Sequence, residues 1–378
     1  MEKIVFINQW ASYITKDIIN AFAEKHKNVA LIAGNISESG SKLNSSIRIN
    51  RIIRYNKRNI FTRAVTWIVA TIQIIFIINT RYKGFHLFLT SNPPTASFIP
   101  MFCNNSYSVQ ILDIYPDALL AGKFIKSKSF LLKLWERRNV KYFRGAKNIF
   151  TISDGMAKTI SKYITPEKIT VINQWPAIKG IGIIDKELNN FIQKHSLNGK
   201  FIVMYSGNIG LGHHVSSLIE SANILKAYKD IIFVIIGEGW NKPVIEKMIK
   251  DYALNNCLLL PFQPVEMFRH SLQAADIGVV SVSKEMANLS IPVKTYNLIS
   301  HGIPLMAITE GESELSNLVD KFNIGKSFAF NEINGMTEFI LSLYKNKDFL
   351  HIYRNNLKVC AEEFSPANAY KYPEKFIF

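Results

Sequence analysis

Residues 201–214 read FIVMYSGNIGLGHH. The first six form a short, mostly apolar run, and three glycines follow it within six positions, Gly207, Gly210 and Gly212. A buried strand that runs through a glycine-rich turn into a helix is typical of a parallel sheet covered on both faces. Glycines let the backbone approach a ligand, and a helix amino end attracts phosphate. The stretch predicts an α/β domain with a phosphate site at the turn; a tight turn without a ligand is the alternative.

The same alternation of short apolar runs and helical patterns extends in both directions from this stretch. Expected strands cover 3–8, 29–33, 85–91, 109–113, 148–153, 169–173, 201–206, 231–237, 257–261, 277–282 and 305–308. Expected helices cover 15–25, 94–102, 129–143, 154–163, 213–228, 241–253, 264–273, 292–301 and 333–346. The sequence therefore predicts the α/β class, with two Rossmann-like, doubly wound domains facing across a cleft. We expect domains at 1–180 and 200–360, a linker at 181–199, and a tail at 361–378 that packs back on the first domain.

The charge is concentrated in the first half of the chain. The 378 residues hold 45 Lys and Arg against 29 Asp and Glu, whereas residues 51–150 alone hold 16 against 3. Such a basic surface predicts an anionic partner, and the chain has no nucleic-acid-binding motif, so we expect an anionic membrane surface and no nucleic acid. The three cysteines form no CxxC pair, which predicts neither disulfides nor a metal site. With no signal-peptide pattern at the start, a cytoplasmic location is expected.

Residues 64–79 (AVTWIVATIQIIFIIN) contain no charge and are flanked by Arg58, Arg63, Arg81 and Lys83. At about 1.5 Å per residue the run reaches about 24 Å, short of a hydrocarbon core of roughly 30 Å. A buried helix is the leading interpretation, and a helix lying in a membrane interface is the alternative. The flanking cations favour the interface, because each adds attraction to an anionic leaflet.

Three further turns carry candidate ligand groups. Residues 236–239 (IGEG) end one strand with two glycines, and residues 260–264 (LPFQP) offer an aromatic face and an amide that suit a base. Lys294 follows Pro292 in the first turn of a helix, where a cation is unfavourable unless it meets an anion. Phosphate binding by Lys294 is therefore predicted. Turns without a ligand, and a buried Phe262, are the alternatives for the other two segments.

Several segments resemble the donor half of GT-B glycosyltransferases, and more narrowly glycosyltransferase family 4 of the bacterial capsule, O-antigen and colanic acid type. They are SGNIGLGHHVSSLIESA (206–222), IIGEG (235–239), LPFQP (260–264), AADIGVV (274–280) and IPVKTYNLISHGIPLMAI (291–308). The first half adds SNPP (91–94), LDIYPDAL (112–119), TISDGM (151–156) and VINQW (171–175) in the expected order. The resemblance covers nearly the whole chain.

The resemblance implies a retaining glycosyltransferase that needs no metal or cofactor. It would move a sugar from a nucleotide-diphosphate sugar, with UDP preferred, to a lipid-diphosphate-linked saccharide at the inner face of the cell membrane. Asp113 and Lys294 are the catalytic candidates, with Asp113 orienting or deprotonating the acceptor hydroxyl or only capping a turn. Donor-binding candidates are Gly207, Asn208, Gly210, His213, Gly237, Glu238, Gly239, Phe262, Gln263, Lys294, Tyr296 and Asn297. Acceptor-binding candidates are Asn8, Gln9, Trp10, Asn92 and Tyr115, of which the first three are equally able to cap a helix.

The chain departs from the family pattern at several donor positions. Asn297 stands where the family has the second glutamate of its paired motif, and Leu289 stands at the first. The usual Arg and Lys of the glycine turn are absent, with Asn208, His213 and His214 nearby instead. An amide makes weaker hydrogen bonds to a ribose than a carboxylate does. The alternative function is therefore a catalytically degraded relative that binds a nucleotide or a partner enzyme in a polysaccharide assembly complex.

Overall fold

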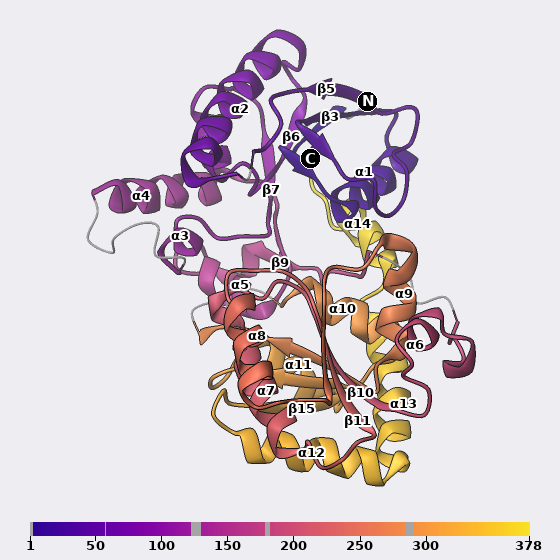
Figure 1. The fold of residues 1–378 in the computed structure, drawn as a ribbon. Helices are drawn as coiled ribbons and strands as arrows, with labels where there is room; N and C mark the ends of the chain where they lie inside the picture. Colours follow the sequence, from indigo (N-terminus) through magenta and orange to yellow (C-terminus); the bar gives the residue numbers. More distant parts are fainter. Residues whose placement is uncertain (1–2, 57, 122–129, 178–181, 285–286, 288–290) are drawn as a thin grey trace. The chain divides into compact units, whose positions relative to one another are not determined.

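The computed structural model describes residues 3–56, 58–121, 130–177, 182–284, 287 and 291–378, and the chain divides into two compact units (Figure 1). Unit 1 comprises Met1–Ala177 with Ser365–Phe378, and unit 2 comprises Ile178–Ala287 with Ile291–Phe364. Each unit is built on its own parallel sheet with helices on both faces, which confirms the predicted fold class.

Unit 1 has a seven-stranded parallel sheet in the order β5-β3-β1-β6-β7-β8-β9. Alternate residues of β1 enter two different cores: Ile4 and Phe6 pack on one face of the sheet, and Val5 and Ile7 pack on the other. Both faces are buried, so these strands are continuous apolar runs. The strands are β1 Lys3–Ile7, β3 Asn28–Ala33, β5 Arg48–Arg51, β6 His86–Thr90, β7 Tyr107–Ile111, β8 Ile149–Thr151 and β9 Ile169–Val171, with the small pair β2 Trp10–Ala11 and β4 Asn35–Ile36 beside them.

Helices of unit 1 cover both faces of this sheet (Figure 1). They are α1 Tyr13–Lys25, α2 Ile60–Arg81, α3 Asp117–Ala121, α4 Phe130–Gly145, α5 Asp154–Ile160 and α14 Lys371–Glu374, with 3-10 turns η1 Pro94–Met101, η2 Pro166–Lys168 and η6 Pro366–Tyr370. Residues of α2 and α4 enter the same core, whereas α1 packs on the opposite face.

Unit 2 has a six-stranded parallel sheet in the order β12-β11-β10-β13-β14-β15. Its strands are β10 Phe201–Ser206, β11 Ile231–Ile236, β12 Cys257–Leu260, β13 Ile277–Ser281, β14 Leu305–Ile308 and β15 Gly325–Phe328. Its helices are α6 Asn190–Lys194, α7 Val215–Ile224, α8 Lys242–Asp251, α9 Val265–Ala274, α10 Val293–Ser300, α11 Glu314–Phe322, α12 Ile333–Lys345 and α13 Lys347–Glu363, with 3-10 turns η3 Lys186–Leu188 and η4 Leu211–His213. The sequence patterns did not predict β15, α6, α11 and α13 in this unit, nor β2, β4, β5, α3 and α14 in unit 1.

The predicted linker at 181–199 is wrong over its described part. Residues 186–194 form η3 and α6, and Phe191 is fully buried in the core of unit 2. Asn189 caps α6 through its side chain and also donates to His270 O at 2.9 Å. Polar residues were mistaken for a linker because here they cap short helices. Residues 178–181 lie outside the described part of the chain.

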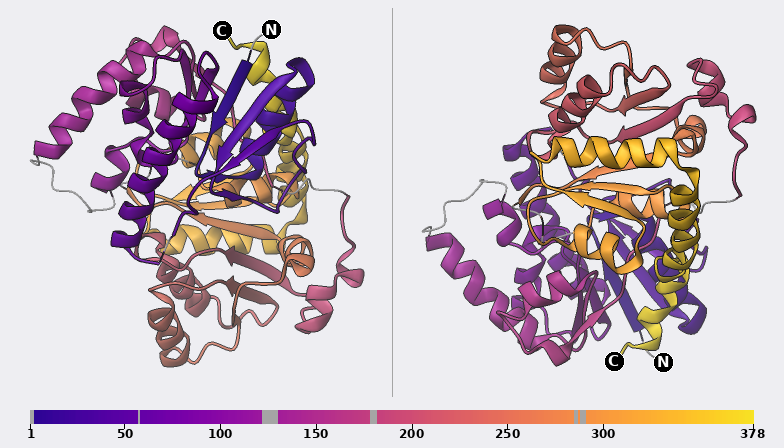
Figure 2. Two further views of the ribbon diagram at one scale, coloured as in Figure 1. Left: turned by 90° about the horizontal axis from the view of Figure 1, so that it is seen from above. Right: turned by 90° about the horizontal axis from the view of Figure 1, so that it is seen from below.

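The C-terminal tail belongs to unit 1. It begins at Ser365 and not at 361, because α13 continues to Glu363 within unit 2. Tyr372 is fully buried against Phe150, and its hydroxyl accepts a hydrogen bond from Gln110 Nε2 at 2.8 Å. Phe376 packs against Phe22 of α1, so the two ends of the chain lie side by side (Figure 2). The tail is therefore an integral part of the first core.

Helix α2 is longer than its uncharged run. It has 22 residues and begins after the capping residue Asn59. At ~1.5 Å per residue it spans about 33 Å, so the length expected from the uncharged run was too short. By length and composition α2 could cross a membrane. However, one side of α2 is in the core of unit 1 through Ala70, Ile74 and Ile78. The opposite side of α2 is exposed. A buried helix was predicted, but only one side of α2 is buried.

Candidate active site

Two glycine turns of unit 2 interlock at the carboxyl ends of β10 and β11. Gly207 N donates to Ile236 O at 2.9 Å, and Ile209 N donates to Glu238 O at 2.8 Å. A Cβ on Gly237 would lie 1.9 Å from Gly207 O, and one on Gly239 would lie 2.4 Å from Ile209 O. Gly207, Gly237 and Gly239 all have φ near +155°. The backbone itself therefore requires glycine at these three positions.

Lys294 extends from the first turn of α10 to the first of these turns. Its Nζ lies 3.9 Å from the centre of the Tyr205 ring, and a Cβ on Gly207 would be 3.0 Å from it. The Nζ is buried and has no hydrogen-bond partner among the described residues. Burial therefore lowers the pKa of the Lys294 ammonium from 10.5 to about 7. A buried cation without a counter-ion is unfavourable, and a bound phosphate would supply the missing charge.

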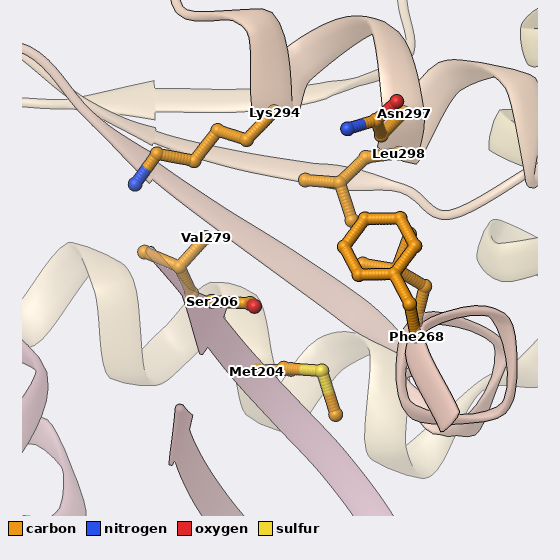
Figure 3. A pocket seen from close by; sticks show the side chains of 8 residues that line it. Met204, Ser206, Phe268, Val279, Lys294, Asn297 and Leu298 are labelled. Carbon is orange, nitrogen blue, oxygen red and sulfur yellow. The ribbon is translucent and has the colours of Figure 1, made fainter. Parts of the chain in front are cut away.

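A pocket of about 50 Å³ lies beside Lys294 (Figure 3). Lys294 and Asn297 project from α10 into it, Phe268 comes from α9, and Met204 and Ser206 come from β10. The Oδ1 of Asn297 is buried there and has no partner among the described residues. Asn297 thus carries an unused acceptor at the position where the resemblance implies a ribose-binding carboxylate. Leu289, at the other glutamate position, lies outside the described residues.

The remaining donor candidates divide by exposure. Phe262 is 55% exposed and Asn208 is exposed, so both are available to a ligand. Gln263 donates from Nε2 to Pro261 O at 2.9 Å, and the exposed Glu238 pairs with Lys242 at 2.8 Å. Tyr296 is the exception, because it is 1% exposed and packs on Phe364 in the core. The prediction that Tyr296 binds the donor is wrong: its place on α10 turns it away from the pocket residues Lys294 and Asn297.

The two histidines of the glycine turn have different surroundings. His213 Nδ1 accepts a hydrogen bond from Gly210 N at 3.2 Å, which leaves the ring proton on Nε2. Burial and the nearby charge of Lys294 lower the pKa of His213, so its ring is a neutral donor. His214 is in the left-handed conformation and stacks on Phe330 with ring centres 3.5 Å apart. His213 is therefore the one placed beside the loop and Lys294.

In unit 1, Asp113 lies after β7, near Tyr115 and Tyr55. Ser91 Oγ accepts hydrogen bonds from the backbone N of Leu112 and of Asp113, at 3.0 and 3.1 Å, which fixes this turn. The Asp113 side chain is exposed at the surface. The surrounding protein atoms nevertheless desolvate its carboxyl, and this desolvation raises the pKa of the carboxyl. The charge of Asp113 in turn contributes to the raised pKa of Tyr115, after burial. Asp113 and Tyr115 also line one small pocket.

The three predicted acceptor-binding residues after β1 differ in exposure, because Asn8 and Gln9 are buried whereas Trp10 lines a cavity. Asn8 and Gln9 are buried, with Asn8 Nδ2 donating to Thr15 Oγ1 at 2.9 Å and Gln9 Nε2 donating to Thr66 O at 3.0 Å. The prediction that they bind acceptor is wrong, because these side chains hold the loop to α1 and α2. Asn92 is likewise turned inward at its Oδ1, which is buried.

Trp10 does reach a cavity. The cavity has a volume of about 500 Å³ and is lined by Trp10, Tyr55, Arg54, Asn35 and Asn56 among others. Trp10 packs edge-on against Tyr55, which stacks on Trp67. Tyr55 was missed because it stands in a short irregular segment after β5 without any motif. Aromatic rings with amides and a guanidinium are a surface that suits a hydroxylated, partly anionic ligand.

The described residues hold no group of three or more His, Cys, Asp or Glu side chains that could bind a metal ion. The groups that converge in unit 2 are instead two glycine turns, one buried ammonium and the unpaired amide oxygen of Asn297. Such an arrangement, at the carboxyl ends of parallel strands, is typical of Rossmann-like domains that hold nucleotides.

Comparison with known proteins identifies this domain. Residues 187–358 match the family model "Glycosyl transferases group 1". The glycosyltransferase WbjE of Pseudomonas aeruginosa, named as probable, is 21% identical over 282 residues, covering 72% of this chain and 69% of that protein. WcaI of Escherichia coli (strain K12), named as a putative colanic acid biosynthesis glycosyl transferase, is 29% identical over 222 residues, covering 57% of this chain and 54% of WcaI.

The whole fold is also that of solved glycosyltransferases. The structure of Anabaena Alr3699/HepE in complex with UDP and glucose superposes with a TM-score of 0.70 over 98% of both chains, at 11% identity. Unit 2 therefore belongs to the glycosyl transferases group 1, and the chain has the GT-B fold with two Rossmann-like domains. This confirms the family resemblance drawn from the sequence.

Proposed function

We propose that this protein transfers a sugar from a nucleotide-diphosphate sugar, with a UDP-sugar as the preferred donor, to a lipid-linked saccharide of a bacterial surface polysaccharide. The observation that carries the proposal is the buried, unpaired ammonium of Lys294 beside the glycine turn at Gly207. Backbone N–H groups and this cation would meet the donor diphosphate, with Asn208 and His213 beside them. In this proposal Phe262 and Gln263 contact the base and Asn297 contacts the ribose.

The proposed chemistry needs charge stabilisation more than a strong base. The bond between the anomeric carbon and the diphosphate oxygen breaks, and the acceptor oxygen forms the new bond on the same face, with retention. The acceptor proton passes to the departing diphosphate, or to Asp113 if the acceptor lies against unit 1. Lys294 would neutralise the negative charge that develops on the diphosphate, as preorganised charge does in enzymes generally. No step in this scheme uses a metal.

The donor is tested first by binding. Thermal shifts of the full chain are measured with UDP, GDP, ADP, TDP and CMP, and then with UDP-sugars. A ligand at about 100 times its Kd adds about 2.7 kcal/mol, which moves Tm by a few degrees. We expect a shift with UDP that Lys294→Met abolishes and that Lys226→Met, at an exposed lysine of unit 2, leaves intact. No shift with any nucleotide would contradict the donor assignment.

The reaction type has its own test. Transfer from a UDP-sugar to a lipid-diphosphate-linked saccharide is followed with EDTA present, and the anomeric configuration of the product is read by NMR. We expect turnover without metal and a product with the configuration of the donor. An inverted product, or activity that requires added Mg²⁺ or Mn²⁺, would contradict the proposal.

We also propose that unit 1 binds an anionic membrane on the cytoplasmic side through α2 and α4. One side of α2 exposes apolar residues at helical spacing, from Phe61, 74% exposed, to Phe76, 67% exposed; between them lie Val65, Ile68 and Ile72. Exposed cations run along α4 in the same way: Lys133, Arg137, Lys141 and Arg144. Both helices pack on η1 and enter the same core. An apolar face beside a basic stripe is the pattern of an interfacial helix surface.

Vesicle co-sedimentation tests this surface. The protein should bind vesicles of phosphatidylcholine with phosphatidylglycerol and bind neutral phosphatidylcholine vesicles much less. Ile72→Asp with Phe76→Asp should abolish binding, because both side chains would have to enter the acyl boundary. The matched change Ile224→Asp, at an exposed apolar residue of unit 2, should have no effect. Equal binding by both variants would contradict this surface.

A second candidate function is a relative that binds nucleotide without turnover. The observation that favours it is Asn297, whose unpaired Oδ1 replaces the carboxylate that the resemblance implies for the ribose. In this case the protein binds UDP, shows no transfer with any acceptor, and gains none in the Asn297→Glu variant. Turnover by the natural protein would exclude it.

A further inference from the structure

Unit 2 contains a second, larger cavity at the opposite end of its sheet. Its volume is about 1050 Å³, and residues that precede β10, β13 and β14 form one wall: Lys200, Asp276 and Ile303. The glycine turns follow the other ends of the strands, so the six residues of β10 lie between the two sites. Six residues of a strand extend about 20 Å. The cavity shares no lining residue with the pocket at Lys294, and it is thus separate from the proposed donor site.

One face of α13 forms the opposite wall. The residues of α13 that line the cavity recur at helical spacing and include both basic and apolar side chains. They are Lys347, Leu350, His351, Arg354, Leu357, Lys358 and Ala361. Leu350 and Leu357 are buried, whereas Lys347 and Lys358 are exposed. The helix therefore gives the cavity an apolar floor and a cationic rim, which is how sites for organic anions are commonly built.

The charges of the cavity do not balance internally. Five lining cations, Lys186, Lys200, Lys347, Arg354 and Lys358, face two carboxylates, Asp185 and Asp276. Asp276 is already paired with Lys186 at 2.6 Å and with Arg354 at 3.7 Å, and it accepts from Ile202 N at 2.9 Å. Lys200 pairs outside the lining with Asp230 at 2.7 Å. Lys347 and Lys358 have no carboxylate partner within the described part of the chain.

His301 adds a buried hydrogen-bonding group. It caps α10 and is 7% exposed, and its Nδ1 donates to Asn297 O at 2.7 Å. Since a carbonyl only accepts, the ring proton is on Nδ1, and Nε2 is a bare acceptor. That Nε2 is buried and has no partner among the described residues. An acceptor that lacks a donor is matched by a ligand hydroxyl.

The loop that closes this side is held in place. Gln273 Nε2 donates to Gly182 O at 3.0 Å, and its Oε1 accepts from Ile184 N at 2.6 Å. Arg269 Nη2 donates to the same carbonyl at 3.1 Å. The cavity is therefore formed by fixed walls rather than by a loose segment.

From these features we infer that the cavity between α13, the end of α10 and the loop at 182–186 is a second binding site, for a phosphorylated sugar. The phosphate lies between Lys347 and Lys358, the apolar face of the sugar ring lies over Leu350, and a ring hydroxyl donates to His301 Nε2. The site is independent of the nucleotide-sugar donor, so its test does not depend on the proposed transferase activity.

The test measures binding of glucose 1-phosphate to the full chain by calorimetry, with inorganic phosphate as the comparison. We expect glucose 1-phosphate to bind more tightly than phosphate, and the double variant Lys347→Gln, Lys358→Gln to weaken it about tenfold or more, because a hydrogen bond to a charged group is lost at each position. The matched variant Lys226→Gln, Lys250→Gln has the same net charge and changes exposed lysines outside the cavity. It should bind as the natural protein does.

Hydrogen exchange locates the ligand. Glucose 1-phosphate should protect peptides of α13 and the segment 299–303, in the natural protein and in Lys294→Met alike. Protection confined to 206–214, with binding lost in Lys294→Met, would put the probe in the donor pocket and overturn the inference. Absence of binding at millimolar concentration would overturn it as well, as would equal loss in the two double variants.

Discussion

Replacing Lys294 by Met should stabilise the protein without ligand while removing its affinity for nucleotide diphosphates. The Nζ of Lys294 is buried over the Tyr205 ring, and burial lowers its pKa from 10.5 to about 7. A lysine in the unfolded chain keeps its ordinary pKa, so between these two values the unfolded state binds a proton that the folded state does not. The folded state is therefore penalised as pH falls from 10.5 to 7, and its stability rises with pH across that window.

The size of the penalty follows from the shift. One pKa unit corresponds to about 1.36 kcal/mol, so the penalty is roughly 4 kcal/mol at pH 7, where the folded-state lysine is half protonated, and roughly 2 kcal/mol at pH 9. Met fills the volume of the lysine stem but carries no charge. Lys294→Met should therefore gain stability over the natural protein by these amounts, with the gain smaller at pH 9.

Hydrogen exchange of peptides from β10 measures the opening of unit 2 for both proteins at each pH, and the comparison at one pH cancels the intrinsic exchange rate. Lys226→Met is the control, since Lys226 is exposed. Equal or lower protection in Lys294→Met at both pH values would refute the argument that the ammonium is desolvated. UDP affinity should fall about tenfold or more in the same variant, because a charge-assisted hydrogen bond is lost.

Three further outcomes are expected. In urea denaturation Gly237→Ala should lower the unfolding free energy by about 3 kcal/mol, because steric strain at its positive φ adds to a backbone clash with Gly207 O. Gly302→Ala, also at positive φ but with open space around it, should cost only about 1 kcal/mol, and similar costs would contradict the interlocked turns. Tyr372→Ala should lower the unfolding free energy of unit 1 by about 4 kcal/mol, measured as faster hydrogen exchange in α1. Unchanged hydrogen exchange would contradict the conclusion that the tail is part of the core of unit 1. Tyr55→Ala should raise the acceptor KM about tenfold and leave the Kd of UDP unchanged; a changed UDP Kd alone would contradict an acceptor role.

The sequence was sufficient for the architecture because a parallel sheet covered on both faces leaves a local signature. Short continuous apolar runs between helical patterns predicted most strands of both sheets, whereas strands without such a run were missed. β5, for example, reads RINR and has one buried residue, Asn50. The glycines of the donor turns were equally predictable, since their role depends on the local backbone.

The role of the other site residues depended on which way a side chain points. Lys294, Tyr296 and Asn297 lie within four positions on one helix, and the sequence treated all three as donor ligands. In the structure Lys294 and Asn297 line the pocket, whereas Tyr296 is in the core. Asn8, Gln9 and Trp10 were likewise all predicted to bind the acceptor. In the structure Asn8 and Gln9 are buried, whereas Trp10 lines a cavity.

By itself, the sequence determined the fold class, the family resemblance, the glycine turns and the basic first half, because each is set by residue type and by spacing along the chain. Only the tertiary structure decided the desolvation of the Lys294 ammonium, the apolar exposed side of α2, and the cavity lined by Lys186, His301 and Lys358. These properties arise from residues that are far apart in sequence. Burial and charge balance are sums over neighbours in space, and the chain's local pattern does not contain them.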